Sequence, residues 1–172
     1  YKRQLLRNID KLSISGRMNS INLGQEFYVL VDYAHTPNGL ARLFEFTNKL
    51  EVNKKIVVTG NAGERDASKR KYVGKLCVDN NDHVIFTYED PRYEDPYNVV
   101  KDLCELIKDK TNYETVIDRE EAINKAINMA NKNDLVMILG KGCEDWQEIK
   151  GEFIEFSDID KAKQAIMKRM NH

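Results

Sequence analysis

The sequence predicts an α/β fold with a Rossmann-like, mostly parallel sheet flanked by helices. Short apolar runs rich in β-branched residues alternate along the chain with longer segments whose apolar residues recur at a helical spacing. This alternation is typical of parallel strands joined by helical crossovers. The chain has 172 residues, of which 41% are hydrophobic, so it can bury the core of one domain.

Five segments are expected to form the parallel strands. Most are apolar throughout, as strands covered on both faces of a sheet should be. They are residues 27–32, 55–60, 83–88, 113–117 and 135–140. A further strand, at an edge of the sheet, is expected near residues 153–156.

Two apolar stripes predict helices in the first half of the chain. Residues 40–50 form one stripe, and residues 100–107 form another. The second helix should begin with Asp95 as its N-cap and Pro96 at its first helical position. Both helices are expected to pack on the sheet.

Capping signals predict two helices in the second half. Asp118 and Glu121 have the spacing of a capping box, and the segment that follows has a buried face over residues 122–130. The last helix should begin with Ser157 or Asp158 as its N-cap.

Composition sets the domain organisation and excludes some partners. Residues 1–14 show none of these strand or helix patterns and are expected to be a tail or linker from a missing upstream domain. Residues 15–172 are expected to form one domain. A formal net charge of -1 favours neither nucleic acid nor a membrane surface as a partner. Cys77, Cys104 and Cys143 lie far apart without CxxC spacing, which argues against a disulfide framework and a zinc site and favours the cytoplasm.

Polar residues gather directly after four of the predicted strands. These segments are residues 32–37, 61–70, 89–92 and 141–147. Loops at the carboxyl ends of parallel strands meet at one edge of the sheet, where ligands bind in open α/β folds. The sequence therefore predicts a ligand site at this edge.

The first polar segment combines a carboxylate with an imidazole before a helix start. Asp32 and His35 precede Pro37, and the helix N-terminus carries partial positive charge that can attract a nucleotide. The alternative is that Asp32 and Thr36 only cap the helix. No GxxxxGK[ST] motif occurs in the chain, so it contains no P-loop for ATP phosphates.

The next two segments can recognise charged groups. Arg65, Lys69 and Arg70 lie near a helix start, where cations oppose the helix dipole, so they indicate an anionic partner or else a solvated basic face. Residues 89–92 place two carboxylates beside Arg92. That loop can bind a zwitterion, or it can be a salt-bridged surface loop.

The fourth segment combines exposed backbone with acidic side chains. Gly140 and Gly142 leave backbone N–H groups accessible beside Glu144. Cys143 has no evident histidine partner, so we expect it to be a small apolar residue and not a nucleophile.

In chain order, these segments resemble the Mur ligase family, closest to its MurE branch, the UDP-N-acetylmuramoyl-tripeptide synthetases. The order and spacing carry the resemblance, and the DYAHTP string is highly specific. The matching strings are GRM at 16–18, DYAHTP at 32–37, GERD at 63–66, EDPR at 89–92, and GKGCE at 140–144.

The resemblance implies the C-terminal, amino-acid-binding domain of a cytoplasmic three-domain ligase. Its UDP-binding domain and its P-loop ATPase domain would lie upstream. In that family, ATP with Mg²⁺ converts a substrate carboxylate into an acyl phosphate, which the amine of an amino acid attacks. The substrates would be UDP-MurNAc-L-Ala-D-Glu and a diamino acid, in peptidoglycan precursor synthesis. The domain would carry no catalytic residue or metal ligand of its own, and alone it is expected to be inactive.

The resemblance also assigns roles to particular residues. Those expected at the nucleotide are Arg17, Asp32 and His35. Those expected at the incoming amino acid are Arg65, Asp90, Arg92, Gly140 and Glu144.

Departures from the family pattern leave the amino acid open. The family's D-N-P-R loop is E-D-P-R at 89–92, its GGDRD is AGERD at 62–66, and its G-K-G-H-E has Cys143 in place of histidine. Arg92 favours a second carboxylate and hence meso-diaminopimelate, whereas Asp90 suits an amine such as that of L-lysine. The alternatives are a related ligase of the folylpolyglutamate or cyanophycin synthetase type, and a stand-alone module that binds a nucleotide or amino acid.

Overall fold

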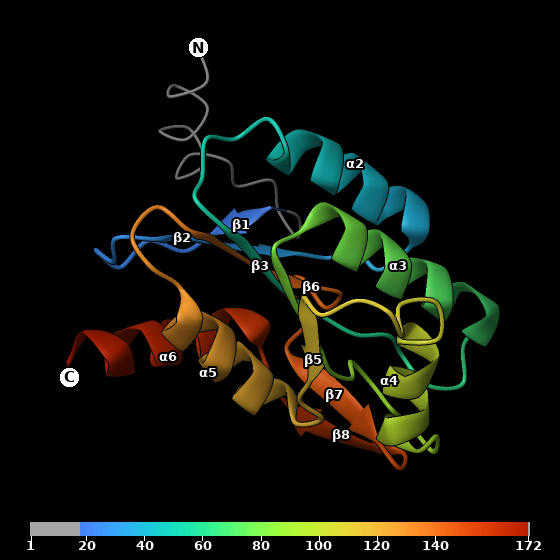
Figure 1. Cartoon of the computed structure of the whole chain (residues 1–172). Helices are drawn as coiled ribbons and strands as arrows, with labels where there is room; N and C mark the ends of the chain where they lie inside the picture. Colours follow the sequence, from blue (N-terminus) through green and yellow to red (C-terminus); the bar gives the residue numbers. More distant parts are fainter. Residues whose placement is uncertain (1–17, 172) are drawn as a thin grey trace.

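The computed structural model describes residues 18–171 and confirms the α/β fold (Figure 1). The predicted tail, residues 1–14, and Arg17 lie outside the described residues. Within residues 18–171, six strands form a central sheet in the order β1-β2-β6-β3-β4-β5. β1 (Asn19–Ser20) pairs antiparallel with β2, and all other neighbours in this sheet are parallel.

The five predicted parallel strands are confirmed. Each begins within one residue of its expected start and ends at, or up to two residues before, its expected end. Their bounds are β2 (Tyr28–Asp32), β3 (Lys55–Thr59), β4 (His83–Phe86), β5 (Tyr113–Thr115) and β6 (Leu135–Leu139). β6 is buried throughout because it lies at the centre of the sheet, between β2 and β3.

The register brings the carboxyl ends of four strands to one level. Asp32 of β2 lies opposite Leu139 of β6, and Thr59 of β3 lies opposite Phe86 of β4. Val58 of β3 lies opposite Ile138 of β6, which aligns the β2–β6 pair with the β3–β4 pair. The four loops that follow these strands therefore start side by side.

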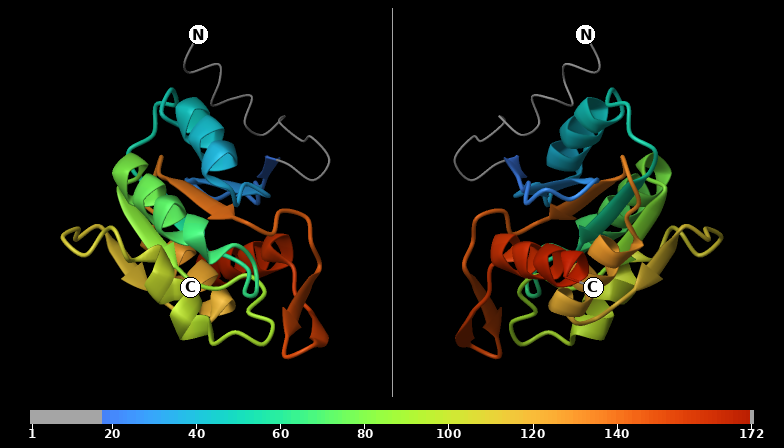
Figure 2. Two further views of the ribbon diagram at one scale, coloured as in Figure 1. Left: turned by 90° about the vertical axis from the view of Figure 1, so that its right-hand side faces the viewer. Right: turned by 90° about the vertical axis from the view of Figure 1, so that its left-hand side faces the viewer.

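Helices cover both faces of the sheet and make a three-layer domain (Figures 1 and 2). One face carries α2 (Pro37–Thr47), α3 (Arg70–Asn80) and α4 (Pro96–Leu103), and the other carries α5 (Arg119–Met129) and α6 (Asp158–Met170). Alternate strand residues divide the core between the faces. Val57 and Met137 pack with the first group of helices, and Val58 and Ile138 pack with the second.

The helix starts follow the predicted caps. Asp95 accepts a hydrogen bond from the Tyr97 amide, and Asp118 accepts one from the Glu121 amide. Ser157, one of the two residues considered, is the cap of α6. None of the helices in the described part of the chain is long and apolar enough to span a bilayer.

The expected edge strand near 153–156 is wrong in its placement. β8 (Glu152–Glu155) does not join the main sheet but pairs antiparallel with β7 (Trp146–Ile149), in a hairpin that projects beside it (Figure 2). Lys150 and Gly151 connect the two strands with φ values of 51° and 80°, the positive-φ pair of a tight hairpin turn. β7 also overlaps the segment 141–147 that was expected to be a loop.

Candidate functional site

The loops after β2, β3, β4 and β6 converge at one edge of the sheet, as predicted, and two adjoining cavities lie there. The first, here called the loop pocket, has a volume of about 510 Å³ and is lined by residues from all four loops. The second, here called the helix pocket, has a volume of about 650 Å³ and lies along α2, from Asn38 to Phe46. Tyr33, His35 and Thr36 line both, so the two cavities share a wall.

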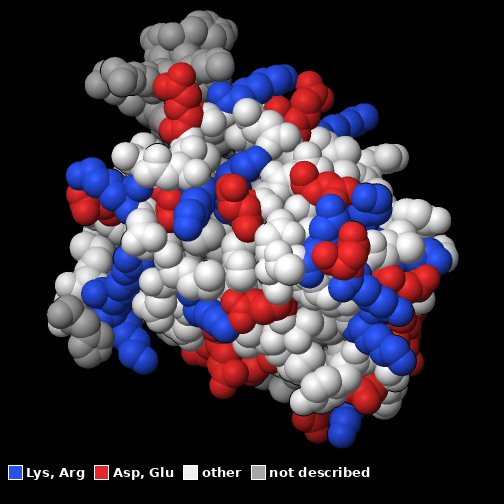
Figure 3. Space-filling model, in the orientation of Figure 1, with Lys and Arg blue, Asp and Glu red and all other residues white. Residues whose placement is uncertain are grey.

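The described residues predicted for the nucleotide and those predicted for the amino acid line different cavities, except that His35 lines both. Asp32 lines the helix pocket and His35 lines both. All five residues expected at the amino acid line the loop pocket: Arg65, Asp90, Arg92, Gly140 and Glu144. Charges of both signs are interspersed over the face in Figure 3, so a charged ligand must be recognised by local groups.

Asp32 fixes the turn that separates the two pockets. Its two carboxylate oxygens accept hydrogen bonds from the backbone amides of Met18 and Ala34, each at 2.8 Å. Thr36, and not Asp32, is the N-cap of α2 and accepts from the Gly39 amide. His35 Nδ1 lies 2.8 Å from the carbonyl oxygen of the neighbouring Tyr33. The helix pocket thus combines a fixed carboxylate with the start of a helix.

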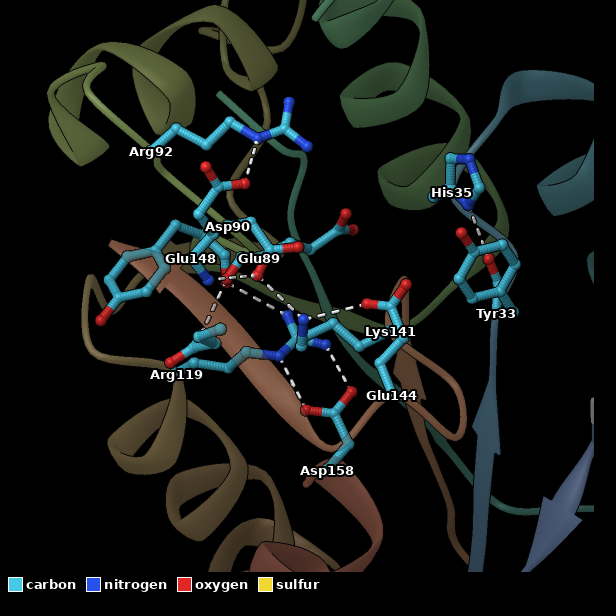
Figure 4. Close-up of polar contacts among 12 residues, drawn as sticks. Tyr33, His35, Glu89, Asp90, Arg92, Arg119, Lys141, Glu144, Glu148 and Asp158 are labelled. Atoms are coloured by element: carbon cyan, nitrogen blue, oxygen red, sulfur yellow. Dashed lines mark hydrogen bonds and ion pairs between the residues drawn. The ribbon is translucent and has the colours of Figure 1, made fainter. Parts of the chain in front are cut away.

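Lys141 organises the floor of the loop pocket, and the sequence analysis did not select it (Figure 4). Its side chain is only 1% exposed, and its Nζ lies 2.9 Å from Asp90 Oδ1 and 3.0 Å from Glu144 Oε2. It also lies over the Trp146 ring, 4.9 Å from the centroid. One internal cation therefore holds two of the predicted carboxylates together. The only sequence signal for Lys141 was its position inside the GKGCE string.

Arg92 is held by the hairpin. Its Nε lies 2.8 Å from Glu148 Oε2 and its Nη1 donates to the Gly63 carbonyl. The Arg92 amide donates to the Glu148 carbonyl, and the Lys150 amide donates to the Arg92 carbonyl. Asp90 and Arg92 therefore pair with Lys141 and Glu148, and not with each other.

The basic residues after β3 do not act as one group. Arg70 is buried and binds Glu94 with both terminal nitrogens, at 2.6 and 2.7 Å, and Asp102 at 2.9 Å. The expectation that Arg70 faces an anionic partner is therefore wrong. Arg65 is exposed at the loop pocket and has no ion pair among the described residues, so its charge is available to a ligand.

A buried ion pair lies beneath the loop pocket. Arg119 and Asp158 are fully buried and bind in a bidentate arrangement, Nε–Oδ1 at 2.8 Å and Nη2–Oδ2 at 2.7 Å (Figure 4). Arg119 also donates to the carbonyl oxygen of Leu139, the last residue of β6, and to that of Tyr88, two residues after the end of β4. The sequence analysis missed this pair. Its signal was an arginine in the first turn of α5, where a cation opposes the helix dipole.

Glu89 is a buried carboxyl group on the pocket floor. It is 6% exposed, and its Oε1 has no hydrogen-bond partner among the described residues. Its pKa is raised to about 7, chiefly by burial and also by the charges of Asp90 and Asp158, against the lowering effect of Arg119 and Lys141. A Cβ atom at Gly140 would lie 1.9 Å from Oε1, so Glu89 requires glycine at that position.

The fold and the two pockets define an α/β domain with two adjoining cavities at the carboxyl edge of its sheet. The chain belongs to the Mur ligase family: residues 16–142 match the model described as "Mur ligase, glutamate ligase domain". The resemblance stated from the sequence is thereby confirmed.

Relatives and solved structures agree with this assignment. The chain is 38% identical over 157 residues to the UDP-N-acetylmuramoyl-L-alanyl-D-glutamate--2,6-diaminopimelate ligase of Listeria innocua, covering 91% of this chain and 32% of the relative. It is 40% identical over 166 residues to the UDP-N-acetylmuramyl-tripeptide synthetase of Borreliella burgdorferi, covering 92% and 33%. A solved structure of a UDP-N-acetylmuramoyl-L-alanyl-D-glutamate--2,6-diaminopimelate ligase superposes with a TM-score of 0.86 at 34% identity, over 98% of this chain and 34% of that one. The chain therefore spans about a third of the length of these relatives.

We predict that Arg119→Met lowers the free energy of unfolding by about 3 to 5 kcal/mol, because Asp158 would stay buried without a partner. Replacing both residues, as Arg119→Met with Asp158→Leu, should restore part of the loss. Urea unfolding of the purified domain measures both effects. Lys161→Met is the control, since it breaks a more exposed pair with Glu120 between the same two helices. An Arg119→Met loss no larger than that of the control would contradict the prediction.

We predict that Glu89 makes the domain less stable as the pH rises. The raised pKa means that the folded state keeps a proton the unfolded state has already lost, so stability falls from about pH 4.5 and levels off above about pH 7. Glu89→Gln should therefore gain stability over the parent, by up to about 3 kcal/mol at about pH 8 and little at about pH 5. Melting temperatures of both proteins at the two pH values measure this. Equal differences at both pH values would rule it out.

Proposed function

We propose that this chain is the C-terminal domain of an ATP-dependent ligase that joins a diamino acid to UDP-MurNAc-L-Ala-D-Glu by an amide bond. One observation carries the proposal: five residues from three separate loops line a single pocket, and the family pattern assigns all five to the incoming amino acid. They are Arg65, Asp90, Arg92, Gly140 and Glu144. The relatives named as diaminopimelate ligase and tripeptide synthetase support the same reaction.

The charges of the loop pocket suit a zwitterionic amino acid. Arg65 offers a guanidinium without an internal partner among the described residues, so it can bind a carboxylate. Asp90 and Glu144 share the single cation of Lys141, which leaves an excess negative charge for an ammonium group. The amino acid then lies with its carboxylate at Arg65 and an amine at the acidic floor.

The helix pocket suits the nucleotide. Asp32 provides a fixed carboxylate, which can accept hydrogen bonds from ribose hydroxyls, and the start of α2 supplies partial positive charge. His35 lies in the shared wall. The family pattern also assigns Arg17 to the nucleotide. Among the described residues, no group of His, Cys, Asp and Glu is placed to hold a metal ion. From the family pattern, we assign the ATP phosphates and Mg²⁺ to an upstream P-loop domain of the same polypeptide, and the reaction to the cytoplasm.

The experiment that tests this function uses the product of the longer reading frame. ADP release should require both UDP-MurNAc-L-Ala-D-Glu and a diamino acid, and mass spectrometry should find the amide product. The 172-residue chain alone should release no ADP, because its sequence contains no P-loop. ATP turnover by the chain alone, or ADP release by the longer protein that does not depend on any diamino acid, would refute the proposal.

In the longer protein, Asp32→Ala should raise KM for ATP about tenfold or more, because a charged hydrogen bond typically contributes about 1.5 to 3 kcal/mol. KM for the amino acid should change little, since Asp32 lines only the helix pocket. Glu45→Ala is the control, because Glu45 lies at an exposed position of α2, the helix that follows Asp32. A variant that melts lower but keeps its KM for ATP would show that Asp32 only fixes the turn.

A further inference from the structure

The cation at the hairpin side of the loop pocket is already paired inside the protein. Arg92 and Glu148 are 2.8 Å apart, and their side chains are 16% and 21% exposed (Figure 4). The backbones of the same two residues are joined by the hydrogen bond from the Arg92 amide to the Glu148 carbonyl, at 3.0 Å. This backbone contact keeps the carboxylate of Glu148 opposite the guanidinium.

The internal contacts of Arg92 occupy some of the hydrogen-bond donors of its guanidinium. A guanidinium binds a carboxylate in a bidentate manner through two adjacent nitrogens. In Arg92, Nε is bonded to Glu148, and Nη1 donates to the Gly63 carbonyl at 3.1 Å. A ligand carboxylate would thus be excluded from the Nε edge. At the remaining edge it would approach a cation that Glu148 already neutralises, and Glu148 itself would repel it.

The neighbouring charges act in the same direction. Arg65 is set aside here because it binds the amino acid's own carboxylate. Apart from Glu89, the remaining charges around the pocket floor are two cations, Lys141 and Arg92, and three carboxylates, namely Asp90, Glu144 and Glu148. The negative excess favours an ammonium group over a second carboxylate on the ligand. Glu148 contributes one of the three negative charges and also neutralises one of the two cations.

We propose that Glu148 is a specificity-determining residue that acts through Arg92. By occupying Arg92, it makes the pocket select a diamino acid whose side chain ends in an amine and carries no second carboxylate, as in L-lysine, over one with a second carboxylate, as in meso-diaminopimelate. This inference rests on the proposed ligase function. Glu148 is a positioning residue, because its effect on the ligand passes through the Arg92 guanidinium.

The test compares kcat and KM for L-lysine and meso-diaminopimelate in the longer protein. The parent should favour L-lysine. Glu148→Gln keeps an oxygen for Arg92 but removes the charge, so kcat/KM for meso-diaminopimelate should rise about tenfold relative to L-lysine, through KM and not kcat. Glu148→Asp keeps the charge and should keep the parent's preference. Glu148→Ser, a smaller neutral variant, should shift the preference as glutamine does, and melting temperatures verify that each variant is folded.

Glu152→Gln is the matched control. Glu152 lies opposite Ile149 in the same hairpin, so the two side chains are on the same face. Glu148 precedes Ile149 and therefore points to the other face. The Glu152→Gln substitution thus removes one negative charge from the hairpin, but on the face opposite to Glu148. Glu152→Gln should leave kcat and KM for both amino acids unchanged. A parent that prefers meso-diaminopimelate, or an unchanged preference in folded neutral variants of Glu148, would overturn the inference while leaving the ligase function in place. Absence of ligation with either amino acid would instead overturn the ligase function.

Discussion

The pocket depends on the buried ion pair between Arg119 and Asp158. Carbonyl groups at the carboxyl ends of parallel strands lose their ladder partners, and a buried carbonyl needs a donor. Arg119 supplies one donor to the segment just after β4 and one to the end of β6, while Asp158 ties the same guanidinium to the start of α6. A buried pair is a weak source of net stability because desolvation offsets the attraction. Its effect here is geometric: Glu89 and Gly140, the first pocket residues after these strands, leave the sheet at fixed positions.

The loops above this pair hold one another in place. The Gly63 amide donates to the Asp90 carbonyl, Lys141 bridges Asp90 and Glu144, and the hairpin binds the loop after β4 through Glu148. Such internal contacts reduce the ordering cost of binding a ligand. They also determine which charges remain for it. Arg65, which has no ion pair within residues 18–171, keeps its full charge for a ligand, whereas Glu148 neutralises much of the charge of Arg92.

The predictable parts of this domain are those encoded by local patterns. Apolar runs located the parallel strands, and Asp95, Asp118 and Ser157 located helix starts, because strand burial and capping act over a few residues. The convergence of the predicted site residues followed from topology alone. The pairing of Arg119 with Asp158 and that of Lys141 with Asp90 were not predictable, since the partners lie 39 and 51 residues apart and no periodicity connects them. The hairpin was missed because its tight turn begins with lysine, a weak turn signal.

The hairpin, which the sequence analysis did not predict, is also the part of the structure that adds chain-specific side chains to the site. The carboxyl edge of a parallel sheet gives a general place for ligands, and the same fold supports different chemistries. In this chain β7 adds specific groups to that edge. Trp146 covers the buried lysine, Gln147 donates to the Glu89 carbonyl at 2.8 Å, and Glu148 binds Arg92. Three consecutive residues of one short strand thus reach three different parts of the pocket wall. Because a strand alternates its side chains between two faces, a shift of β7 by one residue would remove these contacts together, so the register of the hairpin is itself a determinant of what the pocket accepts.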